Sequence, residues 1–336
     1  MTAPTTTRGA SGAGGPGTGA GRGTRPAPPR RRPAAPGPGR FGPGRFGMKK
    51  QEAIAGWVFV APALIGFLAF FVWPAVSGLA YSFTDFDLLT PPEFIGLDNY
   101  VRLVQDPLFW NALGTTTWYV AINIGLQTVL ALGIAVLMHR LTQSMVVRGI
   151  VILPYLIANV VAALVWFYMF DFQLGIVNEI IDWTGLDRVA FFGESAWAIP
   201  TVALINVWRH MGYTALLIFA GLQTIPKEVY EAGVIDGGSE ARMFRSITLP
   251  LLRPVLAMVL VVTVTGSFQI FDTIAVTTQG GPVNSTRVIN YYIFDIAFNR
   301  FDFGYGSAMA LALFLLLAVF TFVQLRLTRA DKSDLG

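Results

Sequence analysis

The chain has 336 residues, of which 54% are hydrophobic and 13% are charged, and its mean hydropathy is +0.56. An ordinary globular domain carries about 25% charged residues, so too few polar side chains remain to cover a soluble body of this size. The absence of cysteine excludes disulfides and thiolate metal sites. The two histidines, His139 and His210, do not predict a histidine-based metal site. The composition therefore indicates a polytopic α-helical membrane protein.

The chain begins with a segment that has almost nothing to bury. Residues 1–47 are mostly Gly, Pro, Ala, Thr and Arg, and such a composition cannot offset the entropy lost on ordering. We expect a disordered cytoplasmic tail there. It is not a secretory signal, because its charged region is far too long. Residues 48–112 are expected to hold the first membrane helix and an extracellular loop, 113–327 a five-helix core, and 328–336 a second cytoplasmic tail.

Six apolar segments follow the tail, and each is long enough to cross a bilayer core, which takes about 20 residues. They predict an all-α fold with six transmembrane helices. The segments are 54–82, 113–138, 147–170, 196–220, 255–276 and 305–327.

Lys and Arg positions predict the orientation, because cytoplasmic loops carry an excess of them. The basic residues gather in the first tail, the loops at 139–148 and 221–254, and the last tail, whereas the other loops are rich in Asp. Both termini and the 224–254 loop are therefore expected on the cytoplasmic side of the cell membrane. The net charge of +4 follows from this distribution, and it does not indicate nucleic-acid binding.

The 224–254 loop reads as a bent pair of short helices. Thr224 and Pro226 predict a helix start, with Pro at the first helical position, and 227–235 forms about two turns. Asp236-Gly237-Gly238 predicts the stop, since glycine adopts the positive φ of a helix end. Ser239 can cap a second helix, which Pro250 and Pro254 are expected to break before the next span.

Apolar and small residues on this loop suggest a lever that enters a groove on a partner. The apolar ones are Val229, Ala232, Val234, Phe244 and Ile247, and the small ones include Gly233 and Gly238. An amphipathic helix lying on the membrane surface is the alternative that the residues alone leave open.

The loop closely resembles the EAA loop of ABC-importer permeases, whose pattern is E-A-A, then D-G-A, a hydrophobic position and L-P. Gly233 and Gly238 stand where that pattern has alanine, at a cost of up to about 1 kcal/mol of helix propensity each. The residues that carry the resemblance, and that it implies for ATPase coupling, are Glu231, Ala232, Gly233, Asp236, Gly237, Phe244, Ile247 and Pro250.

Further segments are similar to the sugar-type permeases of that family and together cover most of 54–327. They are IGLDNYVRLVQDPLFWNA (95–112), GLQTIPKEVYEA (221–232), FQIFDTIAVTTQGGP (268–282) and FGYGSAMALALF (303–314). The resemblance implies a type I ABC importer permease that takes up a carbohydrate or a glycerol-phosphate-like solute.

The family also implies partners: a second permease subunit, an ABC ATPase dimer and an extracellular solute-binding protein. This chain has no G-x-x-x-x-G-K-[ST] run, and its four lysines at 49, 50, 227 and 332 leave no P-loop lysine. We therefore expect ATP hydrolysis in a separate partner. Closure of that partner would move the loop and switch the spans between two states.

Polar residues within the spans are the candidates for a substrate path, because they are costly at membrane depth unless paired or hydrated. Arg209 has two competing interpretations, a structural pair with Asp272 and a snorkelling side chain near the interface. The Ser and Thr residues have one, hydrogen bonds between helices. Asn123 and Gln127 are weaker candidates. The set is Asn206, Trp208, Arg209, His210, Tyr213, Thr263, Ser267, Gln269 and Asp272.

Two other classes of function compete with an ABC permease. A secondary transporter driven by an ion gradient predicts internal repeats and acids within spans; no repeat is evident, and Asp272 is the main acid. A membrane enzyme predicts a catalytic cluster, and the sequence offers no catalytic set, metal site or cofactor motif. A non-sugar solute such as glycerol phosphate stays an alternative for the ABC permease itself.

Overall fold

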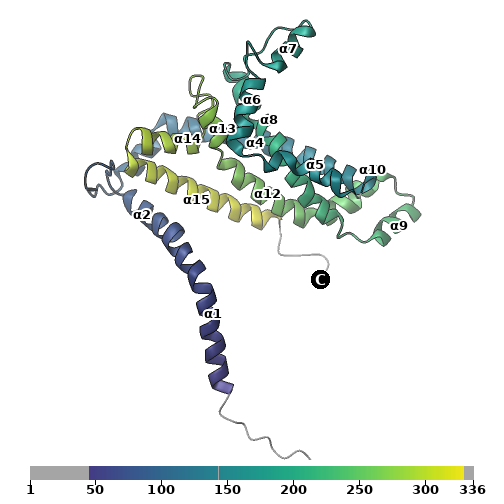
Figure 1. Ribbon diagram of the computed structural model, residues 1–336, viewed down its shortest axis with the longest axis horizontal. Helices are drawn as coiled ribbons and strands as arrows, with labels where there is room; N and C mark the ends of the chain where they lie inside the picture. The colour runs from purple at the N-terminus through teal and green to yellow at the C-terminus, as the bar shows by residue number, and fades with distance from the viewer. Residues whose placement is uncertain (1–44, 143, 329–336) are drawn as a thin grey trace, which may run out of the picture. The chain divides into compact units, whose positions relative to one another are not determined.

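The computed structural model describes residues 45–142 and 144–328 (Figure 1). The predicted tails lie almost wholly outside these residues. The chain divides into two compact units, residues 1–62 and 63–336. The regular secondary structure of the described part is helical apart from an isolated antiparallel bridge between Thr84 and Phe94.

The helices follow the predicted order, with three π-helical turns among them. Their bounds are α1 Arg45–Phe67, a π-turn Leu68–Val72, α2 Trp73–Tyr81, α3 Asp98–Gln105, α4 Pro107–Leu141, α5 Met145–Leu156, α6 Asn159–Met169, α7 Ile176–Trp183, α8 Ser195–Leu222, α9 Lys227–Ile235, α10 Glu240–Met243, a π-turn Phe244–Thr248, α11 Leu249–Leu251, α12 Arg253–Phe268, α13 Asp272–Val276, α14 Ile289–Phe294, a π-turn Asp295–Asn299, and α15 Phe303–Thr328.

Five helical stretches in the described residues are long and apolar enough to cross a membrane. They are Ala53–Tyr81, Pro107–Leu141, Ser195–Leu222, Arg253–Val276 and Phe303–Arg326. Each matches one of the six predicted spans to within a few residues. The count becomes six when the bent pair α5 and α6 is taken as one span.

The third predicted span, 147–170, is wrong as a single helix. α5 and α6 meet at 87° across Ile157 and Ala158. Pro154 stands in the last turn of α5, where it removes a helical donor and favours a break nearby. Polar side chains from other spans bind at this break, as described below.

Two buried clusters pack the helices of the second unit. One joins α3, α4, α8, α12, α14 and α15 around Tyr119 and Tyr305. The other joins α4, α8 and α12 around Ile218, Leu222 and Leu252. In Figure 1, α9 lies at one end of this bundle and α14 at the other. The first cluster therefore lies towards the α14 end of the bundle, and the second lies towards the α9 end.

Asp106 ties the start of α4 to α14 and α15. Its Oδ1 accepts from the backbone N–H of Leu108 at 2.9 Å, and its Oδ2 accepts from the hydroxyls of Tyr292 at 2.6 Å and Tyr305 at 2.7 Å. Burial alone would raise the pKa of Asp106, but the hydrogen bonds from Tyr292, Tyr305 and Leu108 outweigh it. The pKa of this carboxyl therefore lies below its ordinary value.

We expect Asp106→Asn to lower the stability of the bundle by about 1–2 kcal/mol, because an amide is a weaker acceptor for two tyrosine hydroxyls and a helix start. A carboxyl group whose pKa is lower in the folded state contributes its full stabilisation at a pH above its unfolded pKa. This contribution is lost as the pH falls through the folded pKa. The variant should therefore differ from wild type at neutral pH, and the difference should shrink as the pH falls below the ordinary value of 3.8 towards the lower folded pKa. Thermal unfolding in detergent at several pH values measures this.

The exposed residue Asp98, in the first turn of α3, supplies the matched change. Asp98→Asn should have a smaller effect, since it loses only a favourable position at a helix start. Equal effects of the two variants at neutral pH would contradict the role of Asp106.

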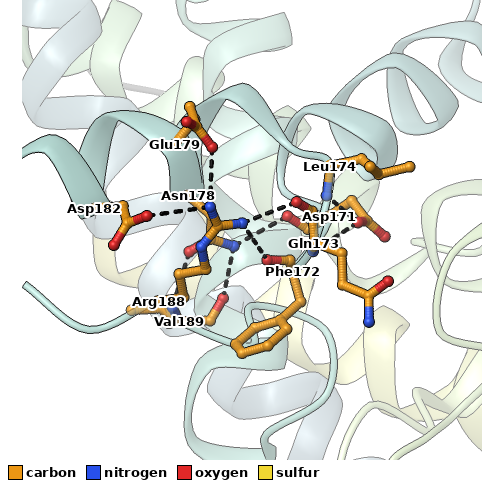
Figure 2. Close-up of polar contacts among 9 residues, drawn as sticks. All are labelled: Asp171, Phe172, Gln173, Leu174, Asn178, Glu179, Asp182, Arg188 and Val189. Carbon is orange, nitrogen blue, oxygen red and sulfur yellow. Dashed lines mark hydrogen bonds and ion pairs between the residues drawn. The ribbon is translucent and has the colours of Figure 1, made fainter.

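Residues 170–194, which include α7, form an arm between α6 and α8, and polar contacts hold this arm together (Figure 2). Asn178 donates to the carbonyls of Asp171 and Val189 and accepts from the N–H of Val189. Arg188 donates to the carbonyl of Gln173 at 2.8 Å and pairs with Glu179 and Asp182. The arm is therefore a folded element, as its polar contacts satisfy the backbone at both of its ends.

Candidate functional site

A cavity of about 310 Å³ opens among the predicted spans of the second unit. Helices α4, α8 and α12 surround it. Two helix breaks also border it, one between α5 and α6 and the other between α12 and α13. The residues that line it are mostly amides, hydroxyls and aromatic rings. They are Tyr119, Asn123, Gln127, Tyr155, Asn159, Asn206, His210, Tyr213, Val262, Thr263, Gly266, Ser267, Gln269, Ile270, Phe271 and Asp272.

Asn123 is the centre of a hydrogen-bond network that joins three helices across this cavity. From α4 it donates to Ser267 Oγ on α12 at 2.8 Å and to Gln127 Oε1 at 3.2 Å, and its Oδ1 accepts from Asn206 Nδ2 on α8 at 3.0 Å. Gln127 continues the network to Thr214 Oγ1 at 2.8 Å. Asn123 is 1% exposed, so these bonds satisfy groups that would otherwise be costly at membrane depth.

The two helix breaks meet beside the cavity. Asn159, the first residue of α6, donates to Asp272 Oδ2 on α13 at 3.0 Å. Arg209 on α8 donates from Nε to the carbonyl of Ile157 at 2.9 Å. Irregular backbone at membrane depth needs such partners when no water reaches it. These side chains therefore stabilise the break in the third span.

Aromatic rings form another part of the cavity wall. Tyr155 and Tyr213 stack with ring centroids 4.5 Å apart and 13° between their planes. His210 lies edge-on to Tyr155 at 5.6 Å. The cavity thus combines flat aromatic surface with amide and hydroxyl groups, the combination that suits a polyhydroxylated solute.

Seven of the nine residues predicted for the substrate path line this cavity: Asn206, His210, Tyr213, Thr263, Ser267, Gln269 and Asp272. The other two lie beside it. Trp208 packs edge-on against Trp166, with centroids 5.3 Å apart, and Arg209 points to the α5 break.

Sequence reasoning missed Tyr119, Tyr155 and Asn159 as lining residues. Asn159 carried a usable signal, because a polar residue shortly after Pro154 in an apolar run marks a broken membrane helix. The two tyrosines carried none, since aromatic residues are common throughout these spans.

The 224–254 loop forms a second candidate site, away from the cavity. α9 spans Lys227–Ile235, the predicted range, but Pro226 is its N-cap and not its first residue. The N–H of Gly238 bonds the carbonyl of Gly233 at 2.9 Å and that of Gly237 bonds Val234 at 3.0 Å, with φ at Gly237 of +73°. This is the Schellman ending that the glycine pair predicts.

In the second half of the loop the predicted cap is confirmed, and only one of the two prolines coincides with a break. Ser239 caps α10 by accepting from the N–H of Arg242 at 3.4 Å. Pro250 does not break the helix, because α10 continues through a π-turn at 244–248 into α11. α11 ends at Leu251 and α12 begins at Arg253, so the predicted break before Pro254 is present. Pro254 sits in the first turn of α12, where it loses no helical hydrogen bond.

The small residues of the loop pack within the loop itself. A Cβ placed on Gly233 would lie 2.9 Å from Ile247 Cδ1, and one on Gly238 would lie 2.7 Å from the carbonyl oxygen of Gly233. These glycines let α9 and α10 pack closely. The exposed surface of α9 instead carries Glu231, Ala232, Val234 and Ile235.

Buried contacts attach the loop to the membrane helices. Tyr230 and Leu251 pack against the cluster of α4, α8 and α12, and the hydroxyls of Tyr230 and Thr248 lie 3.0 Å apart. Arg140 at the end of α4 pairs with Glu240, whose side chain is 77% exposed. Such an exposed pair contributes little, so the buried cluster is the main attachment.

We expect Gly238→Ala to loosen the α9–α10 turn, because its Cβ meets a backbone oxygen that cannot rotate away. Hydrogen exchange of 227–251 should rise by about tenfold, equivalent to about 1.4 kcal/mol. Gly237→Asn is the matched control, since asparagine tolerates a positive φ and nothing lies within 4 Å of a Cβ there. Equal protection in the two variants would contradict the close packing at Gly238.

Comparisons with known proteins match this architecture. The family model described as binding-protein-dependent transport system inner membrane component matches residues 127–330. The chain is 34% identical over 284 residues to the trehalose/maltose transport system permease protein MalF of Thermococcus litoralis, covering 84% of this chain and 96% of that one. It is 33% identical over 249 residues to the sn-glycerol-3-phosphate transport system permease protein UgpA of Pectobacterium atrosepticum, covering 73% and 84%.

A solved structure, a bacterial ABC transporter involved in import of the acidic polysaccharide alginate, shares the fold. Its TM-score is 0.76 at 23% identity, and the match covers 86% of this chain and 100% of that chain.

The fold is that of a multi-pass transport permease. The chain belongs to the family of binding-protein-dependent transport system inner membrane components, as a permease of the sugar ABC importer type.

Proposed function

We propose that this chain is a permease subunit that moves a carbohydrate across the cytoplasmic membrane by alternating access, energised by ATP hydrolysis in a partner. The observation that carries the proposal is the Asn123 network. It lines a polar cavity between spans that are also packed onto the exposed loop. A movement of that loop would be transmitted to the helices around the cavity through their shared core.

The ATPase partner is proposed to dock on α9. Val234 is 61% exposed and Ile235 is 85% exposed on this helix, and an exposed apolar patch of this kind marks an interaction surface. The excess of Lys and Arg in this loop and in both tails supports their place on the cytoplasmic side.

A second permease subunit and an extracellular solute-binding protein complete the proposed assembly. One solved relative of the fold is an alginate ABC transporter in complex with an alginate-bound periplasmic protein. The family membership extends that expectation to this chain.

Co-purification and uptake test the proposal together. Tagged full-length chain should bring down an ATPase subunit, and uptake of labelled disaccharide by membrane vesicles should require ATP. Uptake that survives ATP depletion and collapses when the proton gradient is dissipated would instead establish an ion-driven transporter and reject the proposal.

A further inference from the structure

The hydrogen bonds of His210 define the charge state of this ionisable group in the cavity wall. Arg209 Nη1 lies 3.0 Å from His210 Nε2, and His210 Nδ1 lies 3.0 Å from the carbonyl oxygen of Asn206. A guanidinium can only donate, so Nε2 accepts and Nδ1–H donates to Asn206. His210 is therefore the neutral tautomer. Among the lining residues, Asp272 is the one carboxyl group.

The guanidinium of Arg209, next to His210, does not line the cavity. Arg209 donates Nε to the Ile157 carbonyl and Nη1 to His210, and its guanidinium carbon lies 5.4 Å from the centroid of the Tyr155 ring. Arg209 is not among the residues that line the cavity. Two of the N–H donors of Arg209 are thus committed to the protein, and the side chain lies outside the lining of the cavity.

The carboxylate of Asp272, in contrast, keeps acceptor capacity. In the described part of the chain its side chain accepts one hydrogen bond, from Asn159, and forms no ion pair within 4.0 Å. An ionised carboxylate has two oxygens that accept strongly from hydroxyl donors. It also repels a phosphate, sulfonate or carboxylate solute, and a low dielectric strengthens this repulsion.

We propose that this cavity selects neutral polyhydroxylated carbohydrates and rejects anionic ones, with Asp272 as the specificity-determining residue. The inference rests on the proposed function, because it takes the cavity as the solute path. It decides a question that family membership leaves open, since relatives are named for trehalose and maltose and for glycerol 3-phosphate. Arg209, a candidate for the substrate path when the sequence is read alone, acts instead as a positioning residue for the helix break.

The test uses the complete importer complex, purified through the tagged chain and placed in nanodiscs without added binding protein, so that the permease alone selects. The probes are three neutral disaccharides, trehalose, maltose and lactose, each paired with its 6-phosphate. Direct binding is measured by titration calorimetry for wild type and variants. Wild type should bind a neutral member at least tenfold more tightly than its phosphate.

Asp272→Asn keeps the shape and the acceptor for Asn159 and removes the charge, so the preference should fall at least tenfold towards equality. Asp272→Glu keeps the charge and should keep the preference, which separates charge from folding. Asp187→Asn, an exposed residue outside the cavity, makes the same charge change and should leave the ratio as in wild type.

Each outcome distinguishes this inference from the proposed function. Equal or tighter binding of the phosphates by wild type, or an unchanged ratio in Asp272→Asn, overturns the charge selection and leaves a carbohydrate permease in place. If no disaccharide of either kind binds, the proposed solute class fails and this inference fails with it.

Discussion

Glu231→Lys is expected to reduce ATP-dependent uptake by at least tenfold, about 1.4 kcal/mol of lost interaction. Glu231 is exposed on α9 near the exposed residues Val234 and Ile235. A reversed charge in the middle of a docking surface adds repulsion or leaves a partner charge unpaired, and such changes are costly. Uptake by membrane vesicles, with the amount of co-purified ATPase, measures the effect.

Glu93→Lys is the matched control for this prediction, because Glu93 is an exposed acid in the loop that precedes α3. It should leave both uptake and co-purification as in wild type. Normal uptake by Glu231→Lys would show that the partner does not dock through this face of α9.

Asn123→Leu is expected to raise the apparent KM for solute by about tenfold and to lower stability by about 2–4 kcal/mol. Leucine has a similar size but can neither donate to Ser267 and Gln127 nor accept from Asn206. Each lost bond in a membrane interior costs about 0.6 to 1.7 kcal/mol, and the abandoned amide and hydroxyl groups stay buried. Uptake kinetics and thermal unfolding in detergent give the two readouts.

Asn111→Leu makes the same change on an exposed part of α4, where the side chain reaches the Asn284 carbonyl at 3.4 Å. Its effects on both readouts should be small. A destabilised Asn123→Leu protein with an unchanged KM would show that the network only holds the helices together and would remove the cavity from the solute path.

Much of the helical layout could be predicted because its signals are local. Long apolar runs predict spans, and the extent of α9 follows from Pro226 and Gly237, which act on their own backbone. The same local reasoning failed at Pro250, because the helix continues past this proline from the π-turn at 244–248. That π-turn has no simple sequence signal.

The candidate site was only partly predictable for a related reason. Polar residues in apolar spans identified Asn206, Ser267 and Asp272 as candidates, since their burial requires partners. The sequence did not show which partner each residue would choose. The sequence alone predicts both Trp208 and Asp272 as residues of the substrate path. In the structure Trp208 packs against Trp166, whereas Asp272 lines the cavity wall.

The sequence by itself determined the class of this protein: a helical membrane permease with an EAA-type loop and no P-loop lysine of its own. Composition and local patterns carry that information, because span length and loop punctuation depend on neighbouring residues. Only the tertiary structure decided that Arg209 donates to the backbone at the α5 break, whereas Asp272 accepts from Asn159 and also lines the cavity. That assignment depends on where α8 and α13 meet the third span. Packing brings the Ile157 carbonyl within reach of Arg209, and this carbonyl sets the direction of the guanidinium.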